Sequence, residues 1–303
     1  MDLLGAALTP LDGGFSHETF VAEAAGERSV VRIYAGRGVR RGPDAPEIDA
    51  AVLRLVRGLL PVPEVREVRR PDESAGMPGL LVTSYLKGTR LDLVLPTAAT
   101  DLRRIIGTNV GGLLARLAQM PMLRAGLFVD GDLRIGAFPA GADDLVEWAQ
   151  QHAEKPVLGE WPERDRAGLL EVADRAQRLL DDVGRTCLVH SDFNPKNLLV
   201  DPDTGEITGL VDWEFAHPGT PDSDLGNLLR FDREPEFAGA VLTAYTRRLG
   251  LSPSTVLDRA RASDLWALVD LASRRGENPV ADRAHDQLLA IARTGDLHAV
   301  PVA

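Results

Sequence analysis

The spacing of hydrophobic residues changes near residue 90 of this 303-residue chain. Before that point, short runs rich in β-branched residues are bounded by Gly, Pro or Asp, which is typical of strands. These runs are Phe20 to Ala24, Ser29 to Ala35, Val65 to Arg69 and Gly79 to Tyr85. One helix interrupts them, because apolar residues recur at helical spacing in Pro46 to Gly58.

The rest of the chain has the period of helices. The expected helices are Thr100 to Gln119, Asp143 to Gln151, Arg164 to Val183, Phe237 to Leu249, Ser254 to Arg274 and Asp282 to Thr294. Only the region from Cys187 to Asp212 interrupts them, with two short strands. The pattern predicts an α+β chain with two lobes. A small β lobe with one helix takes residues 1–87, and a larger, mostly helical lobe takes residues 88–303, with a linker near Lys87 to Asp92.

The interrupting segment combines an apolar frame with polar residues at its tip. His190, Asp192 and Asn197 form H-x-D-x-x-x-x-N, and Asp212 ends the apolar strand Ile207 to Val211. A buried strand does not tolerate so many polar groups without partners. This set suits phosphoryl transfer to a hydroxyl, in which one carboxylate accepts the hydroxyl proton while a carboxylate and an amide oxygen hold Mg²⁺.

We therefore expect Asp192 to be the catalytic carboxylate, and Asn197 and Asp212 to be the metal ligands. Taken singly, such an Asp is more often a turn or cap residue, and the complete set in a strand–loop–strand context is what favours chemistry. His190 is expected to be structural, with its ring bonded to the loop backbone. Scattered histidines and a lone cysteine give no zinc spacing.

Net charge, apolar runs and cysteine content limit the kinds of protein that this sequence can encode. The net charge of −11 disfavours nucleic-acid binding, which needs a positive surface. No apolar run is long enough for a membrane span, and the N-terminus lacks the pattern of a signal peptide. The single cysteine, Cys187, excludes an internal disulfide and favours the cytoplasm.

Two segments, HSDFNPKNLL and GLVDWEFAHPGTPDSDLGNLLR, resemble the phosphotransferases of the aminoglycoside-kinase and choline-kinase group, which are small-molecule relatives of the protein kinases. Ser191 stands where this group usually has Gly, and Asn194 where it has His or Lys. The resemblance implies a bilobal protein-kinase-like fold, with Mg²⁺ as cofactor and ATP or GTP as phosphoryl donor. It gives Asp224 a supporting role, in which it caps a helix and bonds the catalytic-loop backbone; an ordinary N-cap explains Asp224 equally well.

The resemblance extends more weakly into the small lobe. PLDGGFSHETF, residues 10–20, is similar to the group's nucleotide-covering loop, in which Gly14 and Ser16 would approach the phosphates. Arg32 matches the phosphate-contacting cation, and a carboxylate of the following helix should pair with it. Asp49 is favoured by spacing and Glu47 by residue type, and we expect Asp49 to be the partner. LLVTSYLKG resembles the hinge, so adenine would bond the backbone from Ser84 to Leu86.

The expected partners are a nucleotide and a small molecule with an acceptor hydroxyl. We expect a kinase that phosphorylates an antibiotic or related natural product of cationic character, of the aminoglycoside or viomycin/capreomycin type. A metabolite kinase of homoserine, choline or ketosamine type, a macrolide kinase and a non-catalytic pseudokinase stay open. A protein kinase is disfavoured because D-F-G and A-P-E segments are missing. The chain is expected to be a monomer or homodimer.

Overall fold

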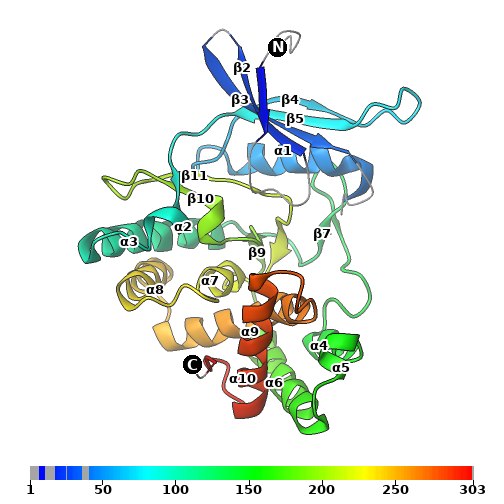
Figure 1. Cartoon of the computed structure of the whole chain (residues 1–303), viewed down its shortest axis with the longest axis vertical. Helices are drawn as coiled ribbons and strands as arrows, with labels where there is room; N and C mark the ends of the chain where they lie inside the picture. Colours follow the sequence, from blue (N-terminus) through cyan, green and yellow to red (C-terminus); the bar gives the residue numbers. More distant parts are fainter. Residues whose placement is uncertain (1–6, 11–17, 25, 36–40, 302–303) are drawn as a thin grey trace.

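The computed structural model describes residues 7–10, 18–24, 26–35 and 41–301, and they form two lobes (Figure 1). The upper lobe is one antiparallel sheet with the strand order β1-β2-β3-β5-β4. Its strands are β1 (Ala7–Pro10), β2 (Glu18–Ala24), β3 (Glu27–Tyr34), β4 (Val65–Arg69) and β5 (Gly79–Ser84). The α+β architecture of two lobes expected from the sequence is thus present (Figure 1).

Helix α1 (Ala45–Val56) follows a 3-10 turn, η1 (Gly42–Asp44), and packs beneath the sheet (Figure 1). Its apolar residues Ile48, Val52 and Val56 are fully buried, as their spacing predicts. They share one hydrophobic core with residues of the lower lobe such as Leu198. The two lobes are therefore joined by apolar packing as well as by the chain.

The lower lobe is built mainly of helices. They are α2 (Leu91–Val94), α3 (Thr100–Ala118), α4 (Leu145–Ala153), α5 (Pro156–Gly159), α6 (Glu163–Asp181), α7 (Ser223–Leu228), α8 (Pro235–Leu249), α9 (Pro253–Ala272) and α10 (Pro279–Thr294). Helix α10 begins earlier than expected because Asn278 caps it, accepting from the N–H groups of Val280 and Ala281. None of the helices among the described residues has the length and apolar character needed to cross a membrane.

The prediction of only two strands in the helical half was wrong. The lower lobe contains β6 (Thr89–Arg90), β7 (Leu127–Phe128), β8 (Ile135–Gly136), β9 (Cys187–Val189), β10 (Leu198–Val200), β11 (Ile207–Leu210) and β12 (His217–Gly219). The β10–β11 hairpin pairs with β6, which lies in the expected linker, and β12 pairs with β9. These strands are too short for a period-two pattern, and the partners of β6 and β9 lie far away in the sequence. In Figure 1 the hairpin lies directly below the upper lobe.

Candidate active site

The loop after β9 is fastened to helix α7 by one carboxylate. The backbone N–H groups of His190 and Ser191 donate to Asp224 Oδ2 and Oδ1, each at 2.8 Å. Asp224 is buried, and burial raises its pKa to about 7. Asp224 lies in the first turn of α7, and the N-cap position belongs to Asp222. The expectation that Asp224 caps this helix was therefore wrong, whereas its bonds to the loop backbone are present. Ser191 has a φ of 66°, so these bonds hold it in the left-handed region.

The His190 ring joins the two polar strand ends. Its Nε2 lies 2.9 Å from the Val211 carbonyl oxygen, and the Asp192 N–H donates to its Nδ1 at 3.3 Å. Burial lowers the pKa of His190 to about 4, so the ring is neutral near pH 7. A neutral ring offers one donor and one acceptor, and both are used here. The ring thus lies as expected, bonded to backbone on both sides.

Asp192 is held by two amides. Asn194 Nδ2 donates to its Oδ1 and Asn197 Nδ2 to its Oδ2, both at 2.8 Å. Burial and the nearby charge of Asp212 raise the pKa of Asp192 to about 6. Each carboxylate oxygen therefore has a fixed direction and still has lone-pair capacity for a further donor, which a proton-accepting group needs.

Asn197 and Asp212 lie on adjacent strand ends. Asn197 closes the short turn η2 (Pro195–Asn197) before β10, and its carbonyl oxygen accepts from the Val211 N–H at 2.9 Å. This bond brings the two expected metal ligands together. Asp212 has a φ of 66°, a conformation that Asp tolerates better than most residues. Its burial raises its pKa, while the charge of Arg32 opposes this effect.

Arg32 reaches from β3 to this strand end. Its Nη2 lies 3.0 Å from Asp212 Oδ1 and 3.0 Å from Glu214 Oε2. Its Nη1 lies 3.9 Å from Asp49 Oδ2. The side chain is 17% exposed, so it faces the site and not the open surface. One cation of the upper lobe thus contacts carboxylates of α1 and of the lower lobe.

Asp49, and not Glu47, faces this cluster. The Tyr34 hydroxyl donates to Asp49 Oδ2 at 2.7 Å, and Arg41 Nη1 donates to Asp49 Oδ1 at 2.6 Å. Glu47 pairs instead with the exposed Arg70 on the outer side of α1. The phase of the helix decides between the two, because Asp49 shares its buried side with Ile48 and Val52.

Four further residues were expected to contact the nucleotide, and two of them cannot be placed. Gly14 and Ser16 lie outside the described residues. Ser84 pairs with Glu64, donating its N–H to the carbonyl oxygen and accepting from the Glu64 N–H at its hydroxyl. Leu86 is half-buried and lies over Gly209, next to the β10–β11 hairpin. The Ser84 N–H is thus engaged within the sheet and is not a free donor for adenine.

The donor set fits Mg²⁺ bound together with phosphates. Magnesium prefers oxygen ligands and commonly takes one or two protein groups, with phosphate and water completing its shell. Asp212 and Asn197 supply one carboxylate and one amide. Among the described residues, no three His, Cys, Asp or Glu side chains gather as a metal-binding group. A metal held by protein groups alone is therefore not supported within this part of the chain.

Comparison with known proteins agrees with this geometry. A model of the phosphotransferase enzyme family, APH, matches residues 7–265. The chain belongs to this family. It is accordingly a phosphotransferase with the fold of the aminoglycoside phosphotransferases.

Two solved structures illustrate the similarity of fold. One is the ternary complex of a thermostable mutant of APH(4)-Ia with ADP and hygromycin B. Its protein shares 20% sequence identity with this chain, and the two structures match with a TM-score of 0.68 over 95% of this chain and 94% of that chain. The GDP and kanamycin complex of APH(2″)-IIIa is 17% identical, with a TM-score of 0.71 over 96% of this chain and 94% of that chain. At these identities the similarity concerns the fold.

One curated relative is a larger protein. Acyl-CoA dehydrogenase family member 10 of Mus musculus is 24% identical over 227 residues, which is 72% of this chain and 20% of that protein. The chain thus spans about a fifth of the length of this relative.

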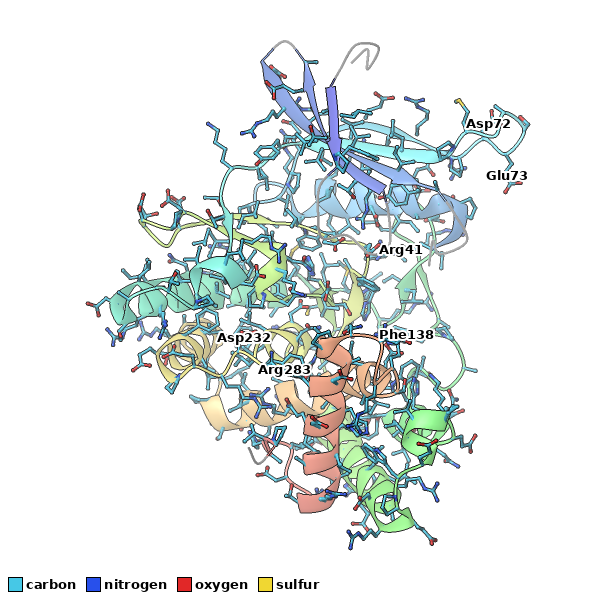
Figure 2. All side chains as sticks on the ribbon, viewed as in Figure 1. Arg41, Asp72, Glu73, Phe138, Asp232 and Arg283 are labelled. Atoms are coloured by element: carbon cyan, nitrogen blue, oxygen red, sulfur yellow. The ribbon has the colours of Figure 1, made fainter. Side chains whose placement is uncertain are left out.

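Asp232 and two arginines form a group of mixed charge on the lower lobe. Figure 2 shows Asp232 and Arg283 beside each other, after α7 and on α10. Burial raises the pKa of Asp232, and the charge of Asp92 raises it further while Arg283 lowers it. Arg230, two residues before Asp232, acts electrostatically on Asp192 and pairs with the buried Asp264, with Nη2 2.6 Å from Oδ1.

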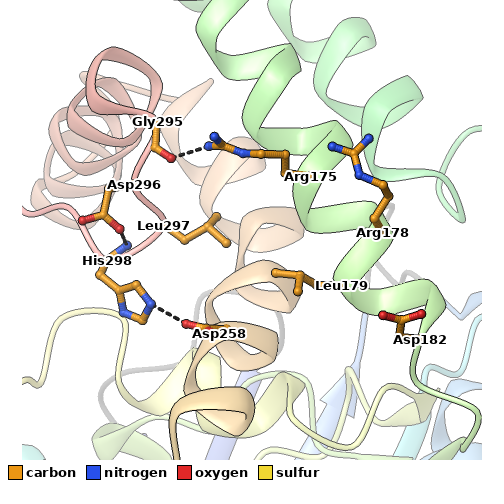
Figure 3. Close-up of a pocket in the computed structure, with 9 residues that line it drawn as sticks. All are labelled: Arg175, Arg178, Leu179, Asp182, Asp258, Gly295, Asp296, Leu297 and His298. Atoms are coloured by element: carbon orange, nitrogen blue, oxygen red, sulfur yellow. Dashed lines mark hydrogen bonds and ion pairs between the residues drawn. The ribbon is translucent and has the colours of Figure 1, made fainter.

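A cavity in the lower lobe is separate from this site. It measures about 490 Å³ and lies between α6, α9 and the segment after α10 (Figure 3). Arg175 and Arg178 line one side, and His298, 2.7 Å from Asp258, lines the other. None of the expected site residues lines this cavity, so it gives no information on the acceptor.

Sequence reasoning missed two members of the Arg32 cluster and left a third undecided. Tyr34 follows Arg32 by two residues on β3, so the strand period could have placed it on the same face. The role of Glu214, two residues after Asp212, could not be decided. Arg41 carried no signal, because it stands in a Gly- and Arg-rich stretch without periodicity.

Proposed function

We propose that this phosphotransferase moves the γ-phosphate of ATP or GTP to a hydroxyl of a cationic antibiotic or related natural product, of the aminoglycoside or viomycin/capreomycin type. The observation that carries the proposal is the meeting of Asp192, Asn197 and Asp212 around two hydrogen-bonded strand ends. Such a set performs phosphoryl transfer by positioning and charge neutralisation.

In this proposal Asp192 accepts the proton of the acceptor hydroxyl. Its two oxygens are already oriented by Asn194 and Asn197, so the remaining lone pairs point in fixed directions. A base with a pKa near 6 is ionised at neutral pH and still basic enough to assist the transfer. His190 and Asp224 hold the loop in place from behind.

Asp212 and Asn197 are proposed to hold Mg²⁺, which when bound would neutralise phosphate charge. Arg32 is proposed to contact the phosphates, because a guanidinium offers paired donors that match phosphate oxygens. Asp49 would orient Arg32 from α1. Residues 1–87 would then form the nucleotide-binding lobe and residues 88–303 the lobe that carries the catalytic loop and the acceptor.

The cationic character of the acceptor is inferred from the overall charge of the protein. The chain carries a net charge of −11, which attracts a cationic small molecule over longer distances.

The test is magnesium-dependent release of ADP or GDP in the presence of acceptors. The panel holds aminoglycosides, viomycin-type peptides, macrolides, homoserine, choline and a fructosamine, with Asp192→Asn as the blank. Asp192→Asn is expected to keep nucleotide binding and lose turnover by about 10²–10⁴-fold. Turnover by this variant at the wild-type rate would exclude Asp192 as the base.

Calorimetry with nucleotide and Mg²⁺ tests the metal ligands separately. Asp212→Ala is expected to lose magnesium-dependent nucleotide binding. The control is Asp203→Ala, an exposed residue in the turn between β10 and β11, which is expected to keep nucleotide binding. Nucleotide binding without turnover against every acceptor would favour the pseudokinase alternative. Turnover with homoserine, choline, a fructosamine or a macrolide would replace the proposed acceptor class.

A further inference from the structure

Arg41 connects the two lobes at one point beside the site. Its Nη1 donates to Asp49 Oδ1 at 2.6 Å, and its Nη2 donates to the Ala216 carbonyl oxygen. Asp49 belongs to α1 of the upper lobe, whereas Ala216 belongs to the lower lobe. The Arg41 side chain is 12% exposed, and Figure 2 places it where the two lobes meet. Its two bonds therefore fix the separation between α1 and the segment around Ala216.

The segment that Arg41 holds is the turn that directly follows the proposed metal ligand, Asp212. The Ala216 N–H donates to the Trp213 carbonyl oxygen at 3.0 Å, which closes a tight turn directly after Asp212. The next residue, His217, begins β12 and pairs with Val189 of β9. Strand β9 leads into the catalytic loop. A shift of Ala216 is thus transmitted both to Asp212 and to the loop that carries Asp192.

The other end of Arg41 holds the carboxylate that faces Arg32. Asp49 has a close bond to Arg41 and one to Tyr34 at 2.7 Å, but only a 3.9 Å contact with Arg32. The position of Asp49 therefore depends on Arg41 and Tyr34 more than on Arg32. A guanidinium suits this task because its N–H groups point in several fixed directions, whereas an ammonium is a single point.

We propose that Arg41 is a positioning residue for phosphoryl transfer, which sets α1 and the Asp212 turn in register so that Arg32 and Asp212 meet the nucleotide together. This inference rests on the proposed function. It assigns Arg41 no contact with substrate. The residue acts through Asp49 and through the backbone of Ala216.

The experiment compares Arg41→Lys, Arg41→Met and a matched control, Arg70→Lys. Arg70 also bonds carboxylates beside α1, Glu47 and Asp44, but on the exposed outer side. Turnover is followed by ADP or GDP release with the acceptor that gives the strongest signal in the panel. We expect Arg41→Met to lower kcat by about tenfold or more, with the acceptor KM nearly unchanged. Arg41→Lys should recover part of the loss, and Arg70→Lys should behave as wild type.

Two further measurements separate positioning from a general loss of fold. The magnesium concentration that gives half-maximal rate should rise in Arg41→Met and not in Arg70→Lys, while thermal unfolding shows the fraction folded. Combining Arg41→Met with Asp49→Asn should add little to either single change, because both act through one contact. If folded Arg41→Met has the kcat and the magnesium dependence of wild type, the inference about Arg41 is overturned while the proposed function stands. A wild-type protein without magnesium-dependent nucleotide binding or turnover would overturn the proposed function, and this inference with it.

Discussion

Arg32 Nη2 and Asp212 Oδ1 lie 3.0 Å apart, although 180 residues separate them in the chain. The contact joins the proposed phosphate-binding cation of the upper lobe to the proposed metal ligand of the lower lobe. A bound metal ion and this guanidinium would compete for the same carboxylate, since both are cations at oxygen. Nucleotide phosphates offer Arg32 an alternative anion, so metal and nucleotide are expected to bind together.

Replacing Arg32 by Met tests this competition. Without nucleotide, Asp212 and Glu214 lose a cation, so Mg²⁺ alone should bind more tightly than in wild type. With nucleotide, the lost phosphate contact should weaken binding by about tenfold, the usual effect of losing a charge-assisted hydrogen bond. Calorimetric titration of Mg²⁺ with and without nucleotide measures both effects. Equal weakening in the two titrations would mean that Arg32 and the metal do not compete.

The pKa of Asp192 predicts the acid limb of the rate profile. A carboxyl group accepts a proton only when it is ionised, and burial with the charge of Asp212 raises its pKa to about 6. We expect kcat/KM to be half-maximal near pH 6, to level off roughly one pH unit higher, and to fall about tenfold per pH unit well below it. Asn194→Ala removes one bond to the carboxylate, so the midpoint should move upward. A profile with its midpoint near pH 4 would contradict this assignment.

The buried His190 predicts a loss of stability in acid. Its pKa is about 4 in the folded protein against 6.5 ordinarily, so the unfolded chain binds the proton first. The stabilisation is present above pH 6.5 and is lost as the pH falls toward 4, in total on the order of 3 kcal/mol. Urea unfolding of wild type and His190→Gln at several pH values measures it. The difference between the two free energies of unfolding should shrink as the pH falls, and a constant difference would contradict the prediction.

Helix α7 tolerates no side chain at Gly226. A Cβ there would lie 2.1 Å from the Ala260 carbonyl oxygen of α9, which is backbone and cannot rotate away. Gly226→Ala is expected to cost about 1–3 kcal/mol of stability and to shift Asp224, which holds the catalytic loop. Gly112→Ala is the matched control, because its Cβ on α3 meets nothing within 4 Å and should gain up to about 1 kcal/mol. Thermal unfolding and turnover of both variants test this, and equal stability of the two would refute it.

The longer helices and the polar loop between β9 and β10 could be predicted because their signals are local. Helix α1 follows from the spacing of Ile48, Val52 and Val56, all of which are buried. The loop follows from the fixed distances between His190, Asp192 and Asn197. Both kinds of signal lie within about one element of the chain, where period and residue type decide the structure.

The remaining features depend on partners that one sequence does not connect. Strand β6 forms because Leu199 pairs with Arg90, and Arg41 bridges the two lobes because the Ala216 carbonyl oxygen lies beside it. Spacing favoured Asp49 over Glu47, and Asp49 is the carboxylate that faces Arg32. The pairing of β6 and the contacts of Arg41 leave no period in the sequence, so they could not have been predicted.

The accessibility of the Cys187 thiol can be used to detect local unfolding around β9. It is the single cysteine of the chain, and on β9 it is buried, with its pKa raised by that burial. Strand β12 covers it on one side, and its neighbour across an isolated bridge is Pro121. A thiol reagent reaches this sulfur only when β9 separates from these neighbours. Because β9 runs directly into His190, the rate at which the Cys187 thiol is modified measures how often the loop that carries Asp192 unfolds locally.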